Sequence, residues 1–190
     1  MILRACLWLA LGGAFVAGAS DSVNVDAQLQ KEFESRVKEY VKLHNTAREG
    51  LDKLKPTKSA GTIESHEERL AHRIRELRHG ARQGDIFTTQ ISAEFRRLIE
   101  PVMQGPEAAR IRESLKRAEP VHLRALQVNG TYPEGVPLQS TPPTLLLNLP
   151  KLPPEVEYRV VGRALVLRDL EANLIVDLIP DVLPEGRRAQ

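Results

Sequence analysis

The stretch that decides the fold is YRVVGRALVLRDLEANLIVDLI, residues 158–179, in which apolar and polar side chains alternate in three short runs. Gly162-Arg163 suits a two-residue hairpin turn, and residues 171–173 suit a three-residue turn. The sequence therefore predicts an antiparallel β-meander whose first hairpin turns at Gly162.

The first turn fixes which side chains share a face of this meander, because strand side chains alternate between the two faces. Counting back from it places Glu157 opposite Arg168 and Tyr158 opposite Leu167. The predicted apolar face carries Val156, Tyr158, Val160, Leu165, Leu167, Ile175 and Ile179. The predicted mixed face carries Glu157, Arg159, Val166, Arg168, Val176 and Leu178. A three-stranded meander with one strongly apolar face has to be covered by other elements.

The second turn would place Leu170 opposite Leu174 and Leu167 opposite Asp177. In this register Asp169 and Asp177 both fall on the apolar face, where carboxylates are unusual. Paired carboxylates could do acid–base chemistry. They also lie near turns and strand ends, where an aspartate commonly bonds the backbone, and we favour that structural interpretation.

Residues 21–54 supply a helix to cover the sheet. Residues 21–54 contain no proline, and apolar positions recur in steps of four and three, which is typical of a helical seam. The seam residues are Phe33, Val37, Tyr40, His44, Ala47, Leu51 and Leu54. We expect Tyr40 and Leu51 to be less exposed than Lys38, Lys42 and Lys53, and His44 to be a buried, hydrogen-bonded core histidine.

Three further helices are predicted before Pro120. The second spans about 63–81 with Thr62 as its N-cap, and the third begins near Thr88 or the threonine after it. Pro101 would end or kink the third helix. The fourth spans about 106–118.

The predicted fold is thus α+β, with about four antiparallel helices followed by a small antiparallel β-meander of three to four strands. Beyond residue 19 we divide the chain into a helical region at 20–118, a β-rich region at 119–184 and a disordered tail at 185–190. Residues 123–128 could form an additional first strand. The segment 142–155 is interpreted as a short helical turn or as an extended segment lying on the sheet.

The first 19 residues have the layout of a secretory signal peptide. Arg4 is a short positive region, residues 6–16 are mostly apolar, and Ala17-Gly18-Ala19 offers small residues to a signal peptidase. The apolar run is too short to span a membrane. We therefore expect cleavage after Ala19, a periplasmic or secreted protein, and no transmembrane segment once the signal is removed.

Removal of that segment would take away the single cysteine, Cys6, so the mature chain would hold no disulfide. The whole chain carries a formal net charge of +2, and Arg4 would leave with the signal. A mature charge close to zero argues against nucleic acid or an anionic membrane as a partner.

The stretches ARQGDIFTTQISAEFRRLI, VNGTYPEGVPL and LLLNLPKLPPEVEYRVVGRALVLRDLEANLIVDLIP carry a resemblance. Over roughly residues 81–184 the chain resembles a family of exported bacterial proteins with no assigned function. The resemblance implies export and fold, and it supplies no catalytic residue.

One cationic stripe stands out on the predicted second helix. His72, Arg75, His79 and Arg82 recur in steps of three, four and three, with Arg78 nearby. Such a stripe could bind an anion or a polyanion, but a solvated helix face has the same pattern, and we favour the latter. No aromatic residues are interleaved for base stacking.

No stretch has the spacing of a metal, cofactor or catalytic motif. His66 and His72 are six residues apart, which is a poor spacing for two helical metal ligands. The sequence thus favours a non-enzymatic interaction or structural module, whose partner is an unidentified protein or a second copy bound through the first helix. The alternative is a periplasmic binding protein for an anionic ligand or a metal ion. An enzyme of unspecified class is the least supported hypothesis.

Overall fold

The computed structural model describes residues 19–52, 54–118, 126–132 and 143–183. The elements in chain order are α1 (Ala19–Glu49), α2 (Ala60–Leu77), α3 (Thr89–Gln104), α4 (Ala108–Ala118), α5 (Pro143–Leu146), β1 (Val156–Val161), β2 (Ala164–Asp169) and β3 (Leu174–Ile179). Helices followed by a C-terminal three-stranded antiparallel sheet of order β1-β2-β3 confirm the predicted α+β class. The predicted signal segment up to residue 18 and the predicted tail at 185–190 lie outside the described residues.

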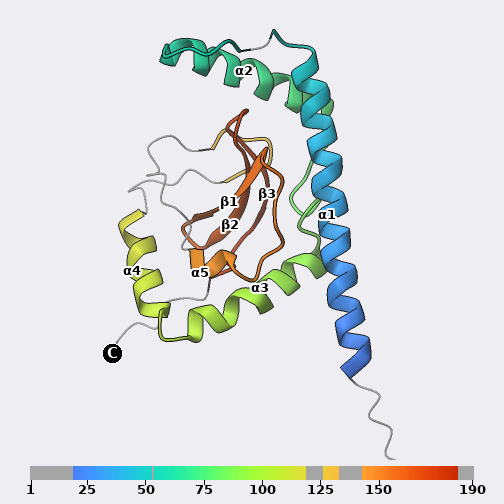
Figure 1. The fold of residues 1–190 in the computed structure, drawn as a ribbon, viewed down its shortest axis with the longest axis vertical. Coiled ribbons are helices and arrows are strands. Elements are labelled where there is room, and N and C mark those ends of the chain that lie inside the picture. The colour runs from blue at the N-terminus through green and yellow to red at the C-terminus, as the bar shows by residue number, and fades with distance from the viewer. Residues whose placement is uncertain (1–18, 53, 119–125, 133–142, 184–190) are drawn as a thin grey trace, which may run out of the picture.

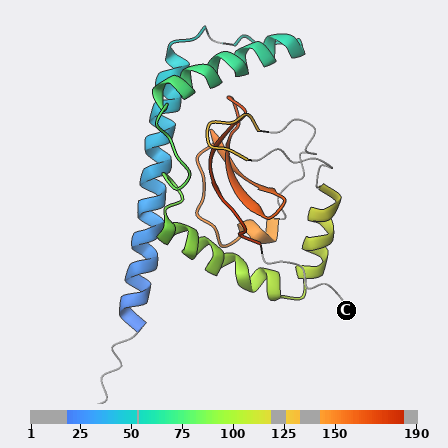
Figure 2. The same cartoon turned by 180° about the vertical axis from the view of Figure 1, so that it is seen from behind.

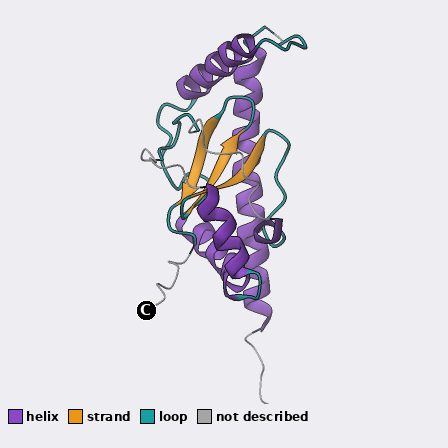
Figure 3. Cartoon of the chain, turned by 90° about the vertical axis from the view of Figure 1, so that its left-hand side faces the viewer, coloured by secondary structure: helices purple, strands orange, loops and turns teal. Residues whose placement is uncertain are grey.

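The four longer helices form a frame around the sheet (Figure 1). α1 runs along one side, α2 and α3 cross it above and below the sheet, and α4 stands on the far side, as the view from behind also shows (Figure 2). The helices therefore cross one another rather than lying antiparallel. Seen from the side, the sheet is stacked in front of α1 (Figure 3).

An aromatic cluster packs α1 and α3 onto the sheet. Phe33 of α1 lies between Phe95 of α3 and Phe87, with ring centroids 5.0 Å and 5.6 Å away. Tyr158 of β1 completes the cluster, 5.9 Å from Phe95. All four side chains are buried. Aromatic pairs in these geometries are worth about 0.5–1.5 kcal/mol each beyond their burial.

The predicted seam of α1 is the face that packs against this core. Tyr40 is buried and Leu51 half-buried, whereas Lys38 and Lys42 are exposed, so that prediction is confirmed. Lys53 lies outside the described residues. Leu54 is 41% exposed because α1 ends at Glu49, five residues earlier than the seam pattern suggested.

The first residues of α2 and α3 test the two N-caps that the sequence predicted. Thr88 caps α3, since its hydroxyl accepts a hydrogen bond from the Ile91 amide at 3.3 Å. The prediction of Thr62 for α2 is wrong: Ser59 is the N-cap and accepts from the Thr62 amide. Both residue types are good N-caps, and a cap that lies three residues earlier adds most of a turn to the helix. Pro101 lies inside α3, which continues to Gln104.

The first hairpin has the predicted register, with Glu157 opposite Arg168 and Tyr158 opposite Leu167. The second differs beyond Leu167, which does pair with Asp177 as predicted. A register shift between Leu167 and Arg168 pairs Arg168 with Ile175, so β3 carries one extra residue there. A bulge of this kind reverses the alternation of side chains on one side of it.

The bulge exchanges two residues between the faces of the sheet. Val176 packs in the main core under the helices, and Ile175 packs on the opposite face with Val166 and Tyr132. The predicted placement of Ile175 and Val176 is therefore wrong, and so is the pairing of Leu170 with Leu174, because Leu174 pairs with Asp169.

The segment 126–132 covers that opposite face without forming the predicted strand. Leu126 and Val128 pack against its apolar cluster, and Thr131 makes an isolated bridge with Leu174. The rest of the predicted strand, 123–125, lies outside the described residues. The helical-turn interpretation of the segment near residue 145 is confirmed by α5.

Truncation of one residue on each face tests this register. We expect Leu167→Ala to cost about 2–5 kcal/mol of unfolding free energy, because Leu167 is fully buried under the helices. Glu157→Ala should cost less than about 1 kcal/mol, because Glu157 lies on the other face in a partly exposed ion pair with Arg159 and Arg168. Urea unfolding measures both, and equal losses would show that the faces are reversed.

Candidate functional site

The Asp169 carboxylate at the end of β2 is completely buried and is bound from two sides. Its Oδ2 accepts a hydrogen bond from the Tyr40 hydroxyl at 2.6 Å and lies 2.6 Å from His44 Nδ1. Its Oδ1 accepts from the Ala172 amide at 2.8 Å, which shapes the turn after β2. One side chain therefore joins α1 to the β2–β3 connection.

His44 has a carboxylate oxygen at each ring nitrogen. Its Nε2 lies 3.2 Å from Glu171 Oε2, on the opposite side of the ring from Asp169. An ionised carboxylate only accepts hydrogen bonds, so only a doubly protonated ring satisfies both contacts. Burial works to lower the pKa of His44, but the hydrogen bonds and charges of Asp169, followed by those of Glu171, outweigh it and raise that pKa above its usual value.

Glu171 carries the chain of contacts on to α2. Its Oε1 lies 3.2 Å from Nε2 of His66, which is buried, and its Oε2 lies 3.6 Å from Arg48. His66 Nε2 must hold the proton to donate to Glu171, and within the described residues its Nδ1 has no hydrogen-bond partner. Tyr40, Asp169, His44, Glu171 and His66 thus form one continuous hydrogen-bonded chain, which we call the histidine network.

Arg78, which ends α2, borders the histidine network. Its guanidinium lies 5.1 Å from the centre of the Tyr40 ring and donates two hydrogen bonds to the Val176 carbonyl. Burial lowers the pKa of Arg78. Burial also raises the pKa of Tyr40 well above 10.0, and the charge of Asp169 adds to the effect, so Tyr40 remains a donor.

Asp177 is also completely buried, and it binds backbone rather than side chains. Its two oxygens accept hydrogen bonds from the amides of Gly84, Ile86 and Phe87 at 2.8–3.0 Å, and from its neighbour Leu178. This carboxylate folds the loop between α2 and α3 and places Phe87 in the core. The arrangement agrees with the structural interpretation favoured from the sequence, and it leaves Asp177 no lone pair directed at a substrate.

The four residues of the predicted cationic stripe do not converge on one point. Arg75 donates to the Asn129 carbonyl at 2.9 Å and to the Thr131 hydroxyl at 3.0 Å, so it fastens the 126–132 segment. His72 is exposed and pairs with Glu76, and the His79 ring lies beside the carbonyl of that same glutamate. Arg82 is exposed. Anion binding by this stripe stays a prediction.

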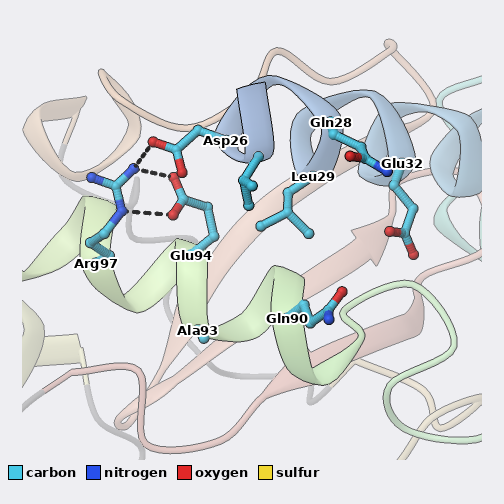
Figure 4. A pocket seen from close by; sticks show the side chains of 9 residues that line it. Asp26, Gln28, Leu29, Glu32, Gln90, Ala93, Glu94 and Arg97 are labelled. Atoms are coloured by element: carbon cyan, nitrogen blue, oxygen red, sulfur yellow. Dashed lines mark hydrogen bonds and ion pairs between the residues drawn. The ribbon is translucent and has the colours of Figure 1, made fainter. Parts of the chain in front are cut away.

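A groove opens where α1 passes α3, with a volume of about 570 Å³. Side chains from both helices line it: Val25, Asp26, Gln28, Leu29 and Glu32 from α1, and Gln90, Ala93, Glu94 and Arg97 from α3. Figure 4 shows Arg97 at one end, where it pairs with Asp26 at 2.7 Å and with Glu94 at 2.6 Å. We call this hollow the α1–α3 groove.

Sequence reasoning found parts of the histidine network but not the whole. It placed His44 as a hydrogen-bonded residue of the buried seam and both aspartates on the apolar face, and these placements are confirmed. It missed the contribution of Glu171 and His66, which are 105 positions apart. The available signal was the spacing of Tyr40 and His44, which puts two polar ends one helical turn apart on an apolar seam.

No family model matches the chain, and no curated protein or solved structure matches it either. Within the described residues, no group of three or more His, Cys, Asp or Glu side chains is arranged to hold a metal ion. None of the helices in this part of the chain is both long and apolar enough to cross a membrane.

Substitution of Asp177 tests its structural role. We expect Asp177→Ala to cost more than about 3 kcal/mol in urea unfolding, because it leaves buried amides without an acceptor. Asp181→Asn is the matched control, since Asp181 is 69% exposed and lies 3.4 Å from Arg163, and asparagine tolerates its left-handed backbone (φ 49°); it should change stability by less than about 1 kcal/mol. Stabilisation by Asp177→Ala would instead show a carboxylate held on the apolar face at a cost to the fold, as at a binding site.

Proposed function

We propose that this chain is an exported, non-enzymatic interaction module that binds a protein segment in the α1–α3 groove. Export rests on the signal-like layout of the first 19 residues, and the resemblance to exported bacterial proteins agrees with it. The observation that carries the binding proposal is the geometry of α1, which continues past α3 and beyond the sheet (Figure 1).

The buried titratable side chains hold elements of the fold together, and this favours an interaction module over an enzyme. Asp169, His44 and His66 are buried, and their contacts are mutual or made with neighbouring elements of the same fold. The Asp177 carboxylate accepts hydrogen bonds from backbone amides. These groups stabilise the packing of α1, α2 and the sheet, and none of them lines the α1–α3 groove.

The α1–α3 groove has a short apolar stretch between polar and charged ends, and protein interfaces likewise have an apolar core with a polar rim. Val25 is 52% exposed and lies with Leu29 and Ala93 along its apolar part. Three carboxylates and one guanidinium line it, and that guanidinium is already paired with Asp26 and Glu94. The third carboxylate, Glu32, pairs with Arg36 of the same helix at 2.8 Å. The groove therefore suits a segment that places a small apolar side chain against Val25, Leu29 and Ala93.

Self-association through the apolar seam of α1 has less support, because that seam is buried against the chain's own sheet and α3. A second copy would have to use the groove as well. The predicted stripe supports an anion-binding protein only weakly, because Arg75 is held by the 126–132 segment and because His79 and Arg82 lie beyond the end of α2.

Site-specific photo-crosslinking in the native cells tests this proposal. A photoreactive amino acid at Gln28 or Gln90, which face each other across the α1–α3 groove, should capture the same protein. The control position is Ala109, exposed on α4 away from the groove. Mass spectrometry of the adduct should also show a chain that begins at Ser20 or within a residue or two.

Val25→Asp should abolish capture, because it places a charge in the apolar part of the groove, where the apolar side chain of the bound segment would lose its contact. Equal capture from Ala109, or no capture from either groove position, would contradict the binding proposal. A full-length chain recovered from the cytosol would contradict the proposal of export.

A further inference from the structure

The first half of α2 has a single buried side chain. Among residues 60–69, His66 is the only buried side chain, and the other nine are exposed or half-buried. The second half is anchored by Leu70 and Ile74, both fully buried, and by a hydrogen bond from Arg73 to the Ala47 carbonyl. In Figure 1 the first half of α2 extends away from α1 above the sheet. His66 is therefore the one buried anchor of this half, beside the half-buried Glu67, which also has an interaction partner.

The hydrogen bond that keeps His66 in place depends in turn on whether the His44 ring is doubly protonated. His66 is bonded to Glu171, which belongs to the turn after β2. Glu171 lies between two imidazole rings, with one oxygen 3.2 Å from each Nε2. Its side chain is 35% exposed, so it has a route into solvent whenever one of these contacts is lost.

We propose that the proton on His44 Nε2 is a latch that docks the first half of α2, so that the helix end is released as the pH rises. Loss of one proton leaves a single N–H on the ring. That N–H stays on Nδ1, because Asp169 is completely buried and lies closer, at 2.6 Å. The Nε2 lone pair then faces Glu171 Oε2 across 3.2 Å, and two acceptors at that distance repel.

Release of Glu171 undocks the helix end. The carboxylate turns toward water or toward Arg48, which is already 3.6 Å away. His66 Nε2–H then loses its acceptor, while its Nδ1 already has no partner in the described part of the chain. A buried imidazole with no hydrogen bond is costly, and exposing the first turns of α2 relieves that cost.

Titratable or charged groups on every element packed around His44 surround the latch. α1 contributes Tyr40 and Arg48, α2 contributes His66 and Arg78, β2 contributes Asp169, and the following turn contributes Glu171. Asp85 and Asp177 act from farther away, through Arg78. The carboxylates nearest to His44, Asp169 and Glu171, favour its charged form.

The direction of the pH response follows from the raised pKa of His44. A histidine whose pKa is higher in the docked state contributes stability that is fully present below about pH 6.5, its ordinary pKa. That contribution disappears as the pH rises through the raised value. Docking therefore weakens on the alkaline side, and the change is independent of the α1–α3 groove, which lies near the other end of α1.

Amide hydrogen exchange of the full chain, followed by mass spectrometry at about pH 6 and about pH 9, tests the latch. After correction for intrinsic exchange rates, protection of residues 60–69 should fall about tenfold for each pH unit by which docking raises the pKa of His44. Residues 70–77, anchored by Leu70 and Ile74, should keep their protection. An equal response of both halves, or none in either, would overturn the proposal.

The variant Glu171→Gln separates a latch from a merely structural contact. An amide at this position can donate to neutral His44 and accept from His66, so docking at about pH 9 should be kept and the fall in protection should vanish. The control His72→Gln removes an exposed imidazole of the same helix and should leave the wild-type response unchanged. A fall in Glu171→Gln equal to that of the wild type, or its loss in His72→Gln, would overturn the proposal. The wild-type and His72→Gln profiles remain decisive if Glu171→Gln does not fold.

Discussion

The interaction on which the rest of the structure depends is the burial of the Asp169 carboxylate at the end of β2. A charge removed from water at this depth needs a partner of opposite charge and further hydrogen bonds. α1 provides both, through His44 and Tyr40, and the turn after β2 adds a backbone amide. Together with the aromatic cluster around Phe33, this contact determines where α1 lies along the sheet.

The second buried carboxylate, Asp177, lies on the same face of the sheet but binds backbone amides instead of the side chains of α1. It collects the amides of residues 84, 86 and 87 and so fixes the loop that joins α2 to α3. Phe87 enters the aromatic cluster from this loop, and α3 begins two residues after it. The direction of α3, and with it the α1–α3 groove, thus follows from a carboxylate in β3.

Local rules predicted the parts of this fold in which sequence neighbours determine the geometry. The two-residue turn at Gly162 and strict alternation gave the first hairpin, and the four-and-three spacing gave the buried face of α1. The bulge in β3 was missed because an extra residue between apolar neighbours leaves no mark in the pattern of Ile175 and Val176. The contact between His66 and Glu171 was missed because it exists only once α2 crosses over the sheet, and no periodicity encodes that crossing.

The protonation state of the His44 ring is the most direct measure of whether the histidine network holds the fold together in this way. Nuclear magnetic resonance of the protein labelled with nitrogen-15 in its histidine rings reports both ring nitrogens separately. At about pH 6.5 an ordinary histidine is half protonated. His44 should then be more than half doubly protonated, with hydrogens on Nδ1 and Nε2, and should reach half protonation only at a higher pH. A His44 ring that is neutral at this pH, or that titrates at or below its ordinary value, would contradict the account.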